Sequence, residues 1–272
     1  MTKLINLLTR TLSGVVYVAI MLGSLLWSPK AFAVVMVFAM LVCMHEFFGI
    51  SRKLGVKPQY ILGMLAAAVM FAASYAICYT WNQWAINLLW FSLIPLLMLI
   101  FFVELFRKSV APFNNIAYTM LPLIYVALPF SLMNIVYNLG GENFMFCFFI
   151  LLWANDTFAY LFGIMLGRHK LFPSISPKKS WEGYVGGILS VVVLSYVLHC
   201  TFDDVALRHM VVMGVIISTT AVLADLVESM LKRSAGVKDS GKIMPGHGGL
   251  LDRFDATLLS LPLVFVYVVL FM

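Results

Sequence analysis

The chain has 272 residues, of which 62% are hydrophobic and only 11% are charged. With a mean hydropathy of +0.99, this composition excludes a soluble globular protein. The formal net charge is +6, but the basic residues lie at the ends of apolar runs, so we expect anionic headgroups and phosphate compounds as partners, and no nucleic acid.

Continuous apolar runs predict helices that cross a bilayer, because a spanning segment must satisfy its backbone hydrogen bonds internally. We predict an all-α, polytopic integral membrane bundle of about nine transmembrane helices. The expected spans are residues 12–27, 31–50, 60–80, 85–104, 116–137, 143–165, 184–202, 207–231 and 254–271. A cytoplasmic N-terminus then places every Lys and Arg except Lys30 and Arg208 on the inner side, as the positive-inside rule requires.

Residues 1–142 hold little chemistry, and we interpret them as a lipid-facing scaffold. Glu46 and Glu104 fall near the inner ends of helices, where a charged side chain can reach the interface. Asn114-Asn115 and Gly140-Gly141 favour turns. Residues 143–272 are expected to form the catalytic part, with cytoplasmic loops at 166–183 and 232–253.

The chemistry begins with Asn155 and Asp156, because an ionised carboxylate inside a span must face protein, water or a cation. The inner loop that follows ends in Ser176-Pro177-Lys178-Lys179-Ser180-Trp181-Glu182-Gly183. Two lysines, a serine and a glycine directly before a helix favour phosphate binding at the helix N-terminus. Near the inner end of span 207–231, Asp225 and Glu228 are three residues apart and share a face. They could be metal ligands, or they could pair with Lys232 or Arg233.

The most polar stretch, residues 232–255, reads KRSAGVKDSGKIMPGHGGLLDRFD. Its clustered glycines allow backbone N–H groups to approach an anion, and its lysines and arginines supply positive charge for phosphate. Asp252 and Asp255 would share a helix face and offer hard oxygen ligands suited to Mg²⁺. A solvated loop that merely obeys the positive-inside rule would explain the charge, but not the glycines and the aspartate pair.

This stretch also resembles a known signature. The runs Ser229-x-Leu231-Lys232-Arg233, Lys238-Asp239-x-Gly241 and Pro245-x-His247-Gly248-Gly249-Leu250-x-Asp252-Arg253-x-Asp255 are similar to the phosphatidate cytidylyltransferase (CDP-diacylglycerol synthase) family. The likeness is sharpest over about 150–256 and includes Asn155-Asp156 and Ser176–Gly183. Met244 departs from the Leu, Ile or Phe expected there and keeps a large apolar side chain.

The resemblance implies that phosphatidate attacks the α-phosphorus of CTP, which gives CDP-diacylglycerol and pyrophosphate in phospholipid biosynthesis. It implies Mg²⁺, with room for a second cation, held by Asp225, Asp252 and Asp255. The catalytic set it implies is Asp225, Lys238, Asp239, His247, Asp252, Arg253 and Asp255. Our own hypothesis is that Asp239 orients Lys238, with a further metal ligand as the alternative role. The substrate-binding set is Asn155, Asp156, Lys178, Lys179, Ser180, Glu182, Lys232, Arg233, Gly246, Gly248 and Gly249. It further implies a homodimer in a bacterial inner membrane, with the active site on the cytoplasmic side.

Two other function classes remain open at this point. Another CTP-dependent lipid enzyme, such as a polyprenol kinase, would need similar phosphate chemistry with a different acceptor. An ion-coupled transporter would fit the intramembrane acids, but it would place charged residues on both sides of the membrane. The outer half of this chain is nearly free of charge, so we favour the enzyme.

Overall fold

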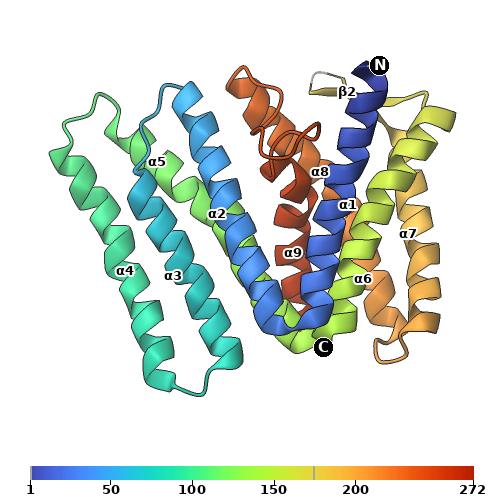
Figure 1. The fold of residues 1–272 in the computed structure, drawn as a ribbon, viewed down its shortest axis with the longest axis horizontal. Coiled ribbons are helices and arrows are strands. Elements are labelled where there is room, and N and C mark those ends of the chain that lie inside the picture. The colour runs from blue at the N-terminus through green and yellow to red at the C-terminus, as the bar shows by residue number, and fades with distance from the viewer. Residues whose placement is uncertain (1, 174) are drawn as a thin grey trace. The chain divides into compact units, whose positions relative to one another are not determined.

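The computed structural model describes residues 2–173 and 175–272, with side chains from residue 9 onward, and it is almost entirely helical (Figure 1). The side chain of Lys3, which the topology prediction counts, lies outside the described residues. The elements in chain order are α1 (Thr2–Trp27), α2 (Pro29–Lys53), α3 (Tyr60–Tyr79), α4 (Gln83–Phe106), α5 (Pro112–Pro122), η1 (Leu123–Ala127), α6 (Leu128–Leu166), β1 (Lys170–Phe172), β2 (Ser176–Ser180), α7 (Trp181–Thr201), α8 (Leu207–Ser234) and α9 (Leu251–Phe271).

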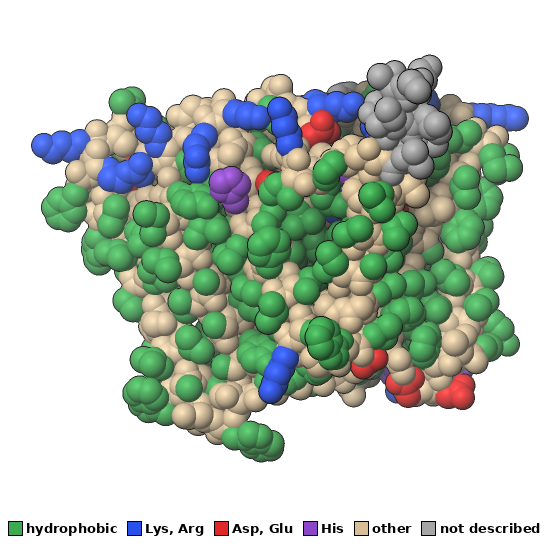
Figure 2. Space-filling view, in the orientation of Figure 1, with side chains coloured by type: hydrophobic (Ala, Val, Ile, Leu, Met, Phe, Trp, Pro, Cys, Tyr) green, Lys and Arg blue, Asp and Glu red, His purple; other side chains and the backbone are tan. Residues whose placement is uncertain are grey.

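Eight helical segments of the described chain are long and apolar enough to cross a membrane. One of them, Pro112–Leu166, has 55 residues, which at 1.5 Å per residue is about 80 Å, more than twice the bilayer core. The backbone of Gly141 (φ 83°, ψ 177°) interrupts this segment, so it supplies the two spans expected from the sequence. Hydrophobic side chains cover much of the visible surface (Figure 2). The prediction of an all-α, polytopic membrane protein with about nine spans is confirmed.

The chain divides into two compact units by its internal contacts. The first unit contains Met1–Ile135 and Ser234–Arg253, and the second contains Val136–Arg233 and Phe254–Met272. The division of roles between residues 1–142 and 143–272 stays a prediction.

In the first unit, α2 packs against α1 and α3, α3 packs against α4, and α5 with the π-helical turn η1 packs on α2 and α3. The carboxylate of Glu104, only 2% exposed, ties these helices together. It accepts hydrogen bonds from Gln59, Arg107, Ser109 and Asn115. Glu104 is therefore a buried acceptor and not an interfacial charge. Asn115 lies inside α5 and not in the expected turn. Its side-chain amide donates to Glu104 and accepts from Lys57 N.

In the second unit, β1 and β2 form an antiparallel hairpin that leads directly into α7. The Ser180 hydroxyl caps α7 by accepting a hydrogen bond from Gly183 N at 3.2 Å. Glu182 accepts hydrogen bonds from the backbone N–H groups of Arg168 and His169, which fixes the start of the hairpin. Among the described residues, this hairpin is the one regular element that is not a helix, and no sequence pattern predicted it.

The break at Gly141 should be needed for the fold. Its φ and ψ fall in a region that is essentially restricted to glycine, so Gly141→Ala should lower the free energy of unfolding by about 1–3 kcal/mol. The measurement is the thermal unfolding midpoint in detergent. Gly23→Ala is the matched control, because a Cβ at Gly23 meets no atom within 4 Å. Equal midpoints for Gly141→Ala and wild type would contradict a required break.

Candidate active site

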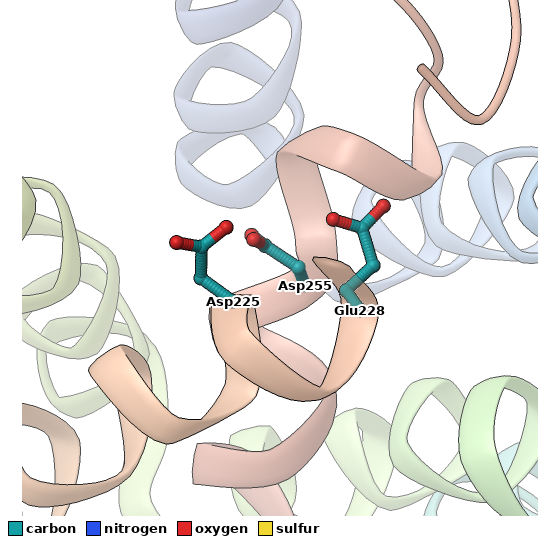
Figure 3. Close-up of side chains that lie close together, drawn as sticks. All are labelled: Asp225, Glu228 and Asp255. Atoms are coloured by element: carbon teal, nitrogen blue, oxygen red, sulfur yellow. The ribbon is translucent and has the colours of Figure 1, made fainter. Parts of the chain in front are cut away.

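Three acidic side chains of the second unit form a cluster, with Asp225 and Glu228 on α8 and Asp255 on α9 (Figure 3). One oxygen atom of each carboxylate lies within 4.8 Å of the others. Glu228 is only 1% exposed, and Asp225 and Asp255 are half-buried. Three like charges at this separation repel one another in a medium of low dielectric constant, so cations or a retained proton must offset their charge.

Two lysines supply positive charge to this cluster. Lys179, on β2, places its Nζ 2.5 Å from Asp225 Oδ2 and 3.1 Å from the carbonyl oxygen of Val222. Lys232, one turn beyond Glu228 on α8, places its Nζ 2.6 Å from Glu228 Oε2. The pairing of Glu228 with Lys232 that the sequence left open is therefore present. Lys179 reaches the cluster because the hairpin holds it directly ahead of α7.

The cluster has the chemistry of a divalent cation site. Carboxylate oxygens are the hard ligands that Mg²⁺ prefers, and three of them converge here. Two of the three expected ligands, Asp225 and Asp255, belong to this group, and Glu228 is its third member. The third expected ligand, Asp252, does not belong to this group, and its role as a metal ligand stays a prediction.

Asn155, on α6, is 1% exposed, and neither side-chain amide atom has a hydrogen-bond partner among the described residues. A Cβ added to Gly187 of α7 would lie 2.9 Å from Asn155 Oδ1, so the glycine provides the space that the Asn155 amide occupies. A buried amide without partners is rare unless a ligand or water satisfies it. The neighbouring Asp156 is exposed. The expected roles of Asn155 and Asp156 in substrate binding stay predictions.

The loop between α8 and α9, residues 235–250, belongs to the first unit and carries most of the signature. Met244 N donates a hydrogen bond to Gly248 O and His247 N donates to Met244 O, each at 3.0 Å, so the chain closes a tight turn. Gly246 and Gly248 have φ angles of 76° and 88°. Residues with a Cβ rarely adopt such angles, which explains these two glycines by backbone geometry alone.

Glu46 of α2 holds this loop. Its carboxylate is 4% exposed and accepts hydrogen bonds from Ser240 Oγ at 2.9 Å, Leu250 N at 3.1 Å and Leu251 N at 2.8 Å. A Cβ at Gly241 or Gly249 would overlap this carboxylate. The interpretation of Glu46 as an interfacial charge is wrong, because the loop buries it. No local sequence signal could reveal this, since its partners lie about 200 residues further along the chain.

Asp252, in the first turn of α9, holds the same loop from the opposite end. Its Oδ2 accepts hydrogen bonds from Gly249 N at 2.8 Å and Ser240 N at 3.0 Å. Negative side chains in the first turn satisfy N–H groups that have no partner within the helix. Asp252 and Glu46 thus fix the start of α9, the helix that carries Asp255 one turn later.

His247 lies where the loop meets α1. Its Nδ1 is 2.7 Å from Ser13 Oγ, and its carbonyl oxygen accepts a hydrogen bond from Arg253 at 3.1 Å. Burial, together with the positive charges of Arg253 and Arg10, lowers the pKa of the His247 imidazole below its usual value. The ring is therefore neutral at pH 7.

Four further residues of the expected site lie at the surface. Lys178, Arg233, Lys238 and Asp239 are all exposed. Lys238 and Asp239 form no ion pair with each other within the described part of the chain, and the expectation that Asp239 orients Lys238 stays a prediction. Ser180 and Glu182 make the helix-cap and hairpin contacts given above, and their expected contact with substrate also stays a prediction.

An acidic cluster with two lysines, set in a polytopic helical membrane protein, is suited to a membrane enzyme that acts on phosphate compounds. The model of the cytidylyltransferase family matches residues 8–271. The chain is 32% identical over 259 residues to the phosphatidate cytidylyltransferase of Staphylococcus saprophyticus, an alignment that covers 94% of this chain and 96% of that protein. It is 33% identical over 261 residues to the protein of the same name from Staphylococcus aureus strain COL, with the same coverage. The chain belongs to the cytidylyltransferase family and is a nucleotidyltransferase.

Replacing the anchoring carboxylate should disable the enzyme without unfolding it. In Glu46→Gln, an amide NH₂ would face N–H donors, and each lost charge-assisted hydrogen bond is worth about 1.5–3 kcal/mol. We expect kcat to fall about tenfold or more and the amides of residues 240–251 to exchange faster with solvent. Glu104→Gln is the matched control, because it alters another buried carboxylate of the same unit that does not contact the loop. Unchanged loop exchange in Glu46→Gln would rule out the anchoring role.

The docking of the loop on α1 should weaken in acid. An undocked imidazole has the usual pKa of about 6.5, whereas docking lowers that pKa, so the undocked state binds more protons and docking is favoured at higher pH. Protection of residues 243–249 from hydrogen exchange, corrected for intrinsic rates, should fall between pH 7.5 and pH 5.5. His247→Gln, which cannot titrate, should show no such fall. Greater protection at pH 5.5 would reverse the sign and contradict this account.

Proposed function

We propose that this protein transfers CMP from CTP to phosphatidate, which forms CDP-diacylglycerol and pyrophosphate in phospholipid biosynthesis. The observation that carries the proposal is the acidic cluster of Asp225, Glu228 and Asp255 with its two lysines, in a chain whose relatives are named phosphatidate cytidylyltransferases over nearly their whole length. A metal-binding acidic group beside cations is what a reaction between two polyanions requires.

The electrostatics of the site suit this reaction. A phosphate monoester is already anionic near neutral pH, so the attacking oxygen needs position and charge neutralisation more than deprotonation. Lys179 and Lys232 hold positive charge at the cluster, and the exposed Lys178 extends it along β2. Asn155 offers a buried amide with free donors and acceptors for a polar substrate group.

Asp225 and Asp255, with Glu228 beside them, are the residues that would hold Mg²⁺. The ion would supply charge neutralisation to the phosphates of CTP. Asp252 has a second role in this proposal, because its carboxylate orders the loop whose Lys238, His247 and Arg253 we assign to phosphate binding. A second cation and a homodimer belong to the proposal on the strength of the family resemblance.

We further propose that the protein lies in the inner membrane of a bacterium, with the site on the cytoplasmic side, where CTP is available. The distribution of Lys and Arg supports this orientation. Lys30→Ala and Arg208→Ala, on the outer side, should leave turnover within about twofold of wild type.

The test of the activity is an assay in detergent with CTP labelled in the cytosine, phosphatidate and Mg²⁺. Labelled CDP-lipid and pyrophosphate should appear in equal amounts. A parallel assay uses CTP labelled at the γ-phosphate with a polyprenol as acceptor. Label in the polyprenol, with no CDP-lipid in the first assay, would replace the proposal with a lipid kinase.

Removing one charge from the acidic cluster should abolish turnover. Asp255→Asn keeps the shape of the side chain but removes a metal-binding charge, and we expect kcat to fall at least about a hundredfold at saturating Mg²⁺. The control is Asp203→Asn, since Asp203 is exposed and lies outside the cluster. A folded Asp255→Asn protein with wild-type turnover and an unchanged Mg²⁺ requirement would remove the cluster from the mechanism.

A further inference from the structure

A groove of about 540 Å³ lies in the first unit, between α1 and the loop of residues 235–250, which we call the signature loop. Six of its lining residues lie on α1, and the seventh, His247, lies on the loop. The lining residues are Arg10, Thr11, Gly14, Val15, Val18, Ala19 and His247. Neither the acidic cluster nor the expected substrate-binding set includes any residue on its α1 side.

The groove is polar at one end and apolar along its length. Arg10 and His247 mark the polar end, and Val15, Val18 and Ala19 continue along α1. From Arg10 to Ala19 the helix rises about 14 Å, close to the half-thickness of a bilayer core of about 30 Å. Arg10 lies two residues ahead of residues 12–27, the first apolar span expected from the sequence. The polar end therefore lies at the depth of lipid headgroups, and the apolar part at the depth of one leaflet of acyl chains.

The loop is fitted closely to α1 at this polar end. Ser13 Oγ donates to Pro245 O at 3.0 Å and lies 2.7 Å from His247 Nδ1. A Cβ on Gly246 would lie 2.8 Å from Arg10 Cγ, and a Cβ on Gly14 would lie 3.6 Å from His247 Cε1. Because Gly246 and Gly14 have no Cβ, Arg10 can pack against the loop and His247 can pack against α1.

The positive charge of Arg10 at the polar end of the groove favours binding of an anion. Within the described part of the chain, no carboxylate forms an ion pair with Arg10. A guanidinium binds phosphate oxygens through paired N–H donors, and a neutral imidazole adds a further polar contact. An arginine at headgroup depth that forms no ion pair among the described residues, next to an apolar strip of α1 about one leaflet long, matches a lipid with an exposed phosphate and an acyl chain.

We propose that this groove binds phosphatidate, with its phosphate at Arg10 and His247 and an acyl chain along Val15, Val18 and Ala19. The identity of the lipid rests on the proposed function. The groove shares His247 with the signature loop, so a phosphate bound there contacts a residue of the expected catalytic set.

Kinetics with both substrates test the site. Arg10→Gln removes a charged phosphate donor and Ala19→Trp fills the apolar channel, so each should raise the KM for phosphatidate about tenfold or more. The KM for CTP should stay within about twofold. Ile20→Trp is the matched control, because Ile20 is exposed on α1 and does not line the groove. An equal rise in the KM for CTP, or an equal effect of Ile20→Trp, would overturn the proposal.

A binding experiment separates this site from the activity. Phosphatidate with a photoreactive diazirine in its acyl chain should label residues 10–20 of the wild-type protein. Excess phosphatidate should compete, phosphatidylcholine should not, and Arg10→Gln should reduce the label. Label on α1 without formation of CDP-lipid would keep the groove and reject the proposed reaction. Formation of CDP-lipid with label elsewhere would reject the groove and keep the reaction.

Discussion

The buried carboxylate of Glu46 is the contact on which the signature loop depends. The loop has no regular secondary structure of its own, and the backbone N–H groups of its buried residues, such as Ser240 and Gly249, need acceptors within the protein. Glu46 accepts two of these N–H groups and one hydroxyl. Asp252 accepts two more N–H groups from the same loop. Two carboxylates thus take the place of the hydrogen bonds that a helix or strand would provide.

This arrangement explains in two different physical ways why glycine is needed at four positions of the loop. Gly246 and Gly248 adopt positive φ angles, whereas Gly241 and Gly249 leave space for the Glu46 carboxylate. A glycine-rich stretch with basic residues suggests backbone donors for a substrate phosphate. In the structure, several backbone donors of this stretch already bind the carboxylates of Glu46 and Asp252. These donors therefore stabilise the conformation of the loop. The charged side chains that remain at its surface, such as Lys238, are the groups left for ligand.

The sequence was sufficient for whatever depends on local composition. Apolar runs predict the spans because hydropathy acts over about twenty consecutive residues, and Gly140-Gly141 marks the break within α6 because glycine alone tolerates that backbone. The pairing of Glu228 with Lys232 follows from helix spacing. The same reasoning failed for Glu46, Glu104 and Asn115, whose roles arise from partners on other elements. A carboxylate near a helix end reads as an interfacial charge until the residues that bury it are known.

The acidic cluster of the second unit shows why charge balance sets the order in which ligands can bind. If all five groups are ionised, the carboxylates of Asp225, Glu228 and Asp255 exceed the ammonium groups of Lys179 and Lys232 by one negative charge. A polyphosphate approaching this group meets repulsion, and a divalent cation would reverse the sign. Lys179 would then be free to leave Asp225 for a phosphate oxygen, because the cation would neutralise the carboxylate in its place. Lys232 is held more firmly, since its partner Glu228 is almost fully buried and would be left as an isolated charge. The two lysines therefore differ physically. The ion pair of Lys179 is partly exposed and could open to a substrate, whereas the ion pair of Lys232 is buried and would hold the cluster together.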